Sequence, residues 1–168
     1  MVFNGVVATV SQPPQSGTVS ITDSNNVTGD TAYLYRVQAF SDQSDSYPSP
    51  YSNVDLATTT DFTIDPPVAN GNIIYAVHLT RLRTAVNAVR VTAVQLQFDW
   101  GDSSSPGATE TPAFGSRILK DEVQKLRYRL NDARSALNLP PQPYSNDPLT
   151  DGVRVLANHI LELRQGVQ

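Results

Sequence analysis

The chain has 168 residues, of which 39% are hydrophobic and 17% charged, and this length suits one ordinary domain or two small ones. A net charge of −4 provides no basic surface for phosphates, so the composition argues against nucleic acid or an anionic membrane as a partner. The absence of cysteine excludes disulfides and thiolate chemistry, and no apolar run is long enough to cross a membrane. The neutral polar composition predicts a secreted or cell-surface protein, with any export signal removed or upstream.

Residues 1–60 have the pattern of β-strands. Short runs rich in Val, Thr, Tyr and Ile alternate with turn-forming Gly, Pro, Asn and Asp. Four strands are expected at residues 5–11, 18–23, 31–41 and 54–59. In the third, Tyr35, Val37 and Ala39 lie on the face that should be buried.

From Asp61 onward the apolar residues recur at three- and four-residue intervals, which predicts amphipathic helices. One stripe runs from Ala76 to Val89, a second from Leu119 to Leu137, and a third helix spans residues 155–167. The residues expected in the helical core are Ile74, Leu79, Leu82, Val86, Leu126, Leu130 and Leu163.

The helices form an internal repeat. The first and third share Ala, His, Leu and Arg in register, with His78 matching His159 and the pair Leu82-Arg83 matching Leu163-Arg164. The second helix keeps the Leu-Arg pair but has Glu122 in place of histidine. Both outer helices follow an Asp-Pro pair, at Asp65 and Asp147. Units that cannot bury their own apolar face are expected to stack on one another.

The segment from Thr31 to Phe40 resembles the penultimate strand of a fibronectin type III domain, and the segment from Ser49 to Thr59 looks like its last loop and strand. The resemblance makes Tyr33 the corner tyrosine, whose hydroxyl bonds back to the backbone. Fibronectin-like strands followed by helical Ala-x-His-x-x-x-Leu-Arg repeats are similar to large secreted surface proteins of environmental bacteria. The resemblance implies architecture rather than an activity.

Only the last four of the seven strands of such a sandwich can be recognised. An open half-sandwich exposes apolar side chains and unpaired strand edges. Either the chain is a piece of a longer protein, or a neighbouring subunit completes the sandwich. For the second case, Val6 and Val10 are candidate assembly contacts, together with the loop tyrosines Tyr47 and Tyr51.

No pattern in the sequence indicates catalysis, a cofactor or a metal. The shared position of His78 and His159 favours a structural role, such as helix capping or a bond to the preceding loop, over metal binding. Asp65 and Asp147 lack the ligand spacing of a calcium loop and suit turns or helix caps. A metal-binding regulatory module would need ligands around His159, Glu162 and Asp151.

Together these patterns predict an α+β protein with a partial fibronectin-III-like antiparallel β-sandwich at residues 1–60 and a helical repeat domain at residues 61–168. Its units span about 61–98, 99–143 and 144–168. The expected function is that of a non-enzymatic extracellular structural or adhesive protein that self-assembles into a fibre or surface layer. The alternative is a carbohydrate- or protein-binding accessory module of a larger secreted protein, for which Tyr47 and Tyr51 would be the exposed aromatic platform.

Overall fold

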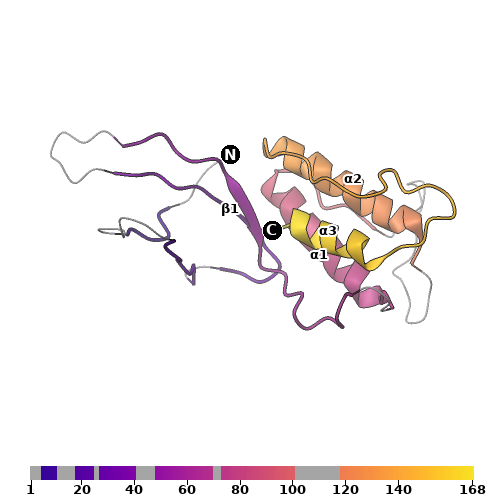
Figure 1. Cartoon of the computed structure of the whole chain (residues 1–168). Helices are drawn as coiled ribbons and strands as arrows, with labels where there is room; N and C mark the ends of the chain where they lie inside the picture. The colour runs from indigo at the N-terminus through magenta and orange to yellow at the C-terminus, as the bar shows by residue number, and fades with distance from the viewer. Residues whose placement is uncertain (1–4, 11–17, 25–26, 41–47, 70–72, 101–117) are drawn as a thin grey trace.

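The protein combines a two-stranded antiparallel sheet with helices (Figure 1). The computed structural model describes residues 5–10, 18–24, 27–40, 48–69, 73–100 and 118–168. Within these ranges the elements are β1 (Ala32–Tyr35), β2 (Asp55–Thr58), α1 (Ala76–Thr92), α2 (Lys120–Ala136) and α3 (Ala157–Gly166). The expected mixture of strands and helices is therefore confirmed, but a fibronectin type III sandwich is not shown.

The sheet contains two of the four expected strands, both shorter than predicted. β1 pairs with β2 in a register that places Ala32 opposite Thr58 and Tyr35 opposite Asp55. The expected strands at residues 5–11 and 18–23 are wrong as far as the structure describes them, because residues 5–10 and 18–23 form no strand. A strand is defined by its hydrogen-bonded partner, so β-prone residues alone do not make one.

The hairpin continues beyond β1 in an irregular form. Ser49 and Ser52 donate their amides to the carbonyls of Ala39 and Val37, while their hydroxyls accept the amides of the same two residues. Val37 is 71% exposed and Ala39 is also exposed, so the prediction that they belong to the core is wrong. Tyr35 is half-buried. The physical reason is that the described residues provide no second sheet to cover this face.

The three helices run in the same direction, so their N-termini lie at one end of the bundle (Figure 1). The described residues after α1 run back along that helix as far as Phe98 beside Asn87, and those after α2 do the same with Gln142 beside Asn131. Each helix turns its apolar stripe towards the other two. The core predictions are confirmed for Leu79, Leu82, Val86, Leu126, Leu130 and Leu163, which are all fully buried; Ile74 is half-buried against the same core.

The hairpin packs on the bundle near the end of α1. Ala32 and Leu56 belong to the same buried cluster as the helical leucines, and the hydroxyl of Thr92 donates to the carbonyl of Ala32. Beyond this junction, the chain on the far side of β1 and β2 extends away from the helices as an arm (Figure 1). We use "the arm" for the described residues 5–10, 18–24, 36–40 and 48–53.

Candidate functional site

The histidine position of the repeat closes the start of each helix. His78 Nδ1 accepts the amide of Tyr75 at 3.1 Å, and His159 Nδ1 accepts the amide of Leu156 at 3.2 Å. In α2 the same bond is made by Glu122, whose Oε2 accepts the amide of Leu119 at 2.7 Å. Each side chain is the third residue of its helix and satisfies an amide that the helix leaves free. The second helix therefore keeps the contact although it has lost the histidine.

These bonds require neutral imidazole rings. Because Nδ1 of His78 accepts a hydrogen bond, its proton resides on Nε2, which lies 2.9 Å from the carbonyl of Pro66 and donates to it. Burial lowers the pKa of His78 below its ordinary value, and burial likewise lowers the pKa of His159, with the charge of Arg127 adding to that effect. Both rings therefore remain uncharged at neutral pH.

The arginine of each Leu-Arg pair is ion-paired between units, and Arg83 and Arg127 are buried whereas Arg164 is partly buried. Arg83 pairs with Glu122 of α2 at 3.3 Å, and Arg127, only 1% exposed at its side chain, pairs with Glu162 of α3 at 3.1 Å. Arg164 closes the set by pairing with Asp65 at 2.6 Å, ahead of α1. The units thus form a closed ring of three, in which each arginine contacts the unit that follows it and the third contacts the first.

An aromatic ring lies under each of these guanidinium groups. Arg83 lies 5.6 Å from the ring centre of Trp100, and Arg127 and Arg164 each lie 4.8 Å from the ring centres of Tyr144 and Phe62. Each aromatic residue lies in the chain before the helix of the unit that follows: Trp100 before α2, Tyr144 before α3 and Phe62 before α1. Trp100 is therefore the counterpart, in the second unit, of Phe62 and Tyr144. The aromatic face and the carboxylate together stabilise a buried cation that would otherwise be costly. We call each arginine, with its acid and its aromatic residue, an arginine joint.

The acid of each joint comes from a different place in the unit. Glu122 lies in the first turn of α2, Glu162 in the middle of α3, and Asp65 in the loop before α1. Asp65 also pairs with Arg81 at 2.6 Å. Asp147, its counterpart in sequence, instead accepts a hydrogen bond from the side chain of Gln124 at 2.9 Å. The two Asp-Pro pairs are therefore not equivalent in their contacts.

A second set of repeated residues, not predicted from the sequence, follows the Leu-Arg pair. Asn87 exchanges two hydrogen bonds with the backbone of Phe98, and Asn131 does the same with Gln142. In addition, Arg90 donates to the carbonyl of Leu96, as Arg134 does to that of Pro140. The constant spacing of 44 residues between Asn87 and Asn131, and between Arg90 and Arg134, was the available signal.

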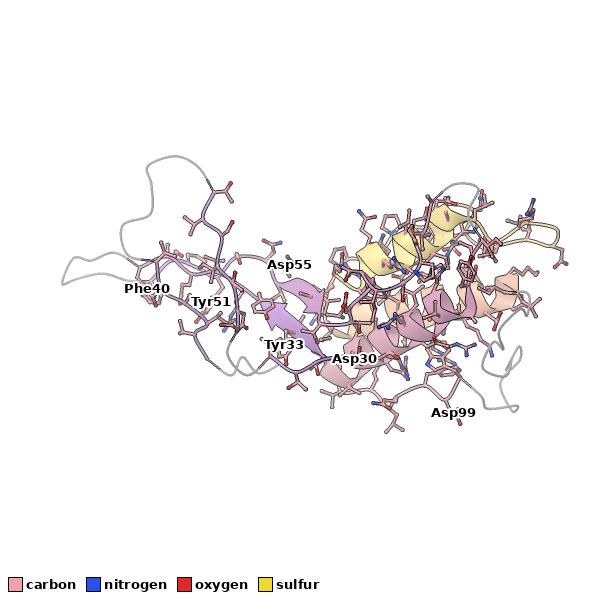
Figure 2. The ribbon with its side chains drawn as sticks, turned by 90° about the horizontal axis from the view of Figure 1, so that it is seen from below. Asp30, Tyr33, Phe40, Tyr51, Asp55 and Asp99 are labelled. Atoms are coloured by element: carbon pink, nitrogen blue, oxygen red, sulfur yellow. The ribbon has the colours of Figure 1, made fainter. Side chains whose placement is uncertain are left out.

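The arm carries the candidate assembly residues. Val6 is 82% exposed, and Val10, Val37 and Phe40 are exposed as well. Figure 2 shows Phe40 and Tyr51 far from the helices. Tyr33 accepts the amide of Thr28 through its hydroxyl at 2.8 Å, a bond back to the upstream backbone of the kind expected there.

The tyrosine platform is only partly described. Tyr47 lies outside the described residues. Tyr51 is 51% exposed, and the Arg36 guanidinium lies 3.5 Å from the centre of its ring. One face of Tyr51 is therefore covered by a cation.

A groove lies where the hairpin meets the end of α2. Its volume is about 550 Å³, and it is lined by Asn53, Val54, Asp55, Leu56, Arg134, Leu137, Asn138, Leu139 and Pro140. The leucines are buried and form an apolar floor, while Asp55 and Arg134 provide one charge of each sign. Figure 2 shows Asp55 at this junction.

Residues considered for a metal are engaged in other contacts. Glu162 accepts hydrogen bonds from Ser145 and from Arg127, His159 caps α3, and Asp151 pairs with Lys120. Across the described ranges, no three His, Asp or Glu residues gather as a metal site would require. The same ranges contain no helix long and apolar enough to span a membrane.

Comparison with known proteins adds no relative. No protein-family model, no curated protein and no solved structure matches this chain. The resemblance to fibronectin type III domains and to bacterial surface repeats therefore stays a prediction from the residues.

Proposed function

We propose that this chain is a non-enzymatic extracellular structural or adhesive protein, whose copies assemble through the arm with β-strand completion between subunits. The observation that carries the proposal is the contrast between the two parts of the molecule. The helices direct their apolar stripes into a shared core, whereas the arm leaves Val6, Val37 and Phe40 more than two-thirds exposed.

The energetics of the arm favour a partner. Burying one large apolar side chain contributes about 1.5–3 kcal/mol, so covering several of these residues would provide a substantial driving force for association. Among the described residues of the arm, residues 5–10 and 18–24 belong to no strand, and a segment that has no strand partner can serve in strand addition. Single exposed apolar residues are ordinary on a protein surface, but several of them in the part of the molecule that extends away from the helices are typical of an interaction site.

The closed ring of arginine joints suits a structural role. Buried ion pairs between successive units hold the three helices in one arrangement, and a fixed body is what a repeating assembly needs from its subunit. The proposed location outside the cell is supported by the neutral polar composition and by the resemblance to secreted surface proteins.

Light scattering combined with negative-stain microscopy of the purified chain tests the proposal. We expect large regular particles for the unaltered chain and monomers for the double variant V37D/F40D. The matched control is V94D/L96D, which introduces the same charges at two highly exposed apolar positions of the helical part and should assemble normally. A monodisperse, cooperatively melting monomer for the unaltered chain would overturn the proposal.

A second candidate function rests on Tyr51. Its half-exposed ring with a covering Arg36 is a suitable element of a carbohydrate- or protein-binding accessory module. In that case the chain would stay monomeric and bind a polysaccharide in an affinity-electrophoresis gel. The variant Y51A should then lose retardation, whereas Y128A, which removes an even more exposed tyrosine from α2, should not.

A further inference from the structure

The outer edge of β2 carries no second strand in the described part of the chain, although one of its outward amides is bound by a side chain. Thr59 donates its amide to Thr31, so in an antiparallel pair the backbone groups of residues 57 and 55 also face β1, and those of Leu56 and Thr58 face away. The amide of Leu56 is bound by the carboxylate of its own neighbour, Asp55. Among the described residues, no strand other than β1 pairs with β2.

The groove beside this edge is suited to apolar side chains. Leu56, Leu137 and Leu139 are each no more than 8% exposed and form its floor. Arg134 already donates to the carbonyls of Pro140 and Gly166, and the charge of Asp55 acts on it. With one cation and one anion at the rim, the groove has no net charge, so it favours an uncharged occupant.

Residues 5–10 have the matching chemistry. Their sequence, Gly-Val-Val-Ala-Thr-Val, carries no charged side chain and consists largely of residues that favour strands. Val6, Ala8 and Val10 would share one face of an extended strand. In their own molecule these residues are all exposed, so they are not docked in their own groove. Six residues are also enough to pair with the four residues of β2.

We propose that residues 5–10 of one copy add as a third strand to the outer edge of β2 in a second copy, with Val6 and Val10 directed into the groove. This inference rests on the proposed function and specifies one contact between the copies, separate from the contact of Val37 and Phe40. The main-chain bonds to β2 would provide affinity, and the apolar floor would select the register, as in other strand additions.

Because the chain has no cysteine, cross-linking between single-cysteine variants tests the contact directly. T9C places a thiol on the opposite face of the donor segment from Val6 and Val10, and N53C places one at the exposed rim of the groove. A size-tagged T9C chain is mixed with untagged N53C and treated with a short bis-maleimide reagent. The control acceptor is T84C, an exposed position on α1.

We expect the T9C–N53C product to exceed the T9C–T84C product several-fold, and to disappear when the donor also carries V6D/V10D. If the chain assembles by light scattering but T9C links N53C no better than T84C, the groove is not the acceptor and only this inference fails. If the unaltered chain stays monomeric, the proposed function fails as well. The inference is also overturned if another molecule fills the groove in the assembled particles, so that T9C is never linked to N53C.

Discussion

At the scale of single residues, the three arginine joints all need a carboxylate beside the guanidinium group, and each joint takes it from a different position in the unit. A buried guanidinium needs a carboxylate, and the repeat supplies it from Glu122, Glu162 or Asp65 according to the unit. Glu122 performs two tasks, because it also caps α2. Its difference from the histidines at the same position therefore has a physical reason: in the second unit this position must also neutralise an arginine.

Replacing Glu122 tests that explanation. The variant E122H brings the second helix closer to the other two in sequence, yet it leaves Arg83 buried and without its acid. We expect a loss of about 3–5 kcal/mol in the free energy of unfolding, measured by urea denaturation. The neighbouring exposed acid provides the control, since D121N should change stability by no more than about 0.5 kcal/mol. A variant E122H as stable as the unaltered chain would show that the ion pair contributes nothing.

The histidine caps predict a pH dependence. The pKa values of His78 and His159 are lowered by burial, so the unfolded chain binds more protons than the folded one as the pH falls below the ordinary histidine pKa. Stability should therefore be full above about pH 6.5 and decrease between there and the lowered pKa values of the folded chain. Urea denaturation at about pH 7.5 and about pH 5.5 measures the difference.

The matched control for this dependence is the double variant H78Q/H159Q. Glutamine also caps from the third helical position but does not titrate in this range. The free energy of unfolding of H78Q/H159Q should therefore change much less between the two pH values than that of the unaltered chain. If the unaltered chain and the double variant lose the same stability on acidification, other groups are responsible.

At the scale of elements, the first two units share the geometry of the helix end as well as its start. Val94 and Asn138 both have a φ of 58° directly after the C-cap, and the amides that follow them donate to Arg90 and Arg134. Asparagine is well suited to this left-handed conformation, whereas a β-branched residue is strained in it. The second unit thus has the better residue at this position.

Exchanging that residue predicts a gain in stability. Because Val94 is 93% exposed, V94N gives up no packing and relieves the backbone strain, so we expect an increase of about 0.5–1 kcal/mol in the free energy of unfolding. The control V91N changes an exposed valine inside α1, where asparagine has no such advantage. Equal effects of the two substitutions on the thermal midpoint would contradict the strain argument.

At the scale of the whole molecule, the hairpin and the helices share one core. Leu56 is 2% exposed and packs in the cluster that contains the leucines of all three helices. We expect L56A to lower the free energy of unfolding by about 2–5 kcal/mol. The unfolding transition of the helices, followed by circular dichroism, should shift together with the transition in Trp100 fluorescence. V37A, at an exposed valine of the arm, should leave both transitions in place. Helical and Trp100 transitions that stay unchanged in L56A would mean that the hairpin folds independently of the bundle, because both probes report on the helical part.

Much of the helical part could be predicted from the sequence because helix formation and burial follow local periodicity. The stripe containing Leu79, Leu82 and Val86 and the repeated Leu-Arg pair each appear within a few residues of chain, and the leucine core is confirmed. The β-part was predicted less well. Val37 and Ala39 alternate as core residues do, but alternation indicates which face is buried only when a second layer exists to cover it.

The sequence by itself determined the three helices, their apolar stripes and the shared positions of His78, Glu122 and His159, since a cap and its amide lie three residues apart. Only the tertiary structure decided that the units close into a ring. The pairs Arg83–Glu122, Arg127–Glu162 and Arg164–Asp65 join residues from 35 to 99 positions apart. Contacts at such distances depend on how the helices pack, and no local pattern specifies which of several acids will meet a given arginine.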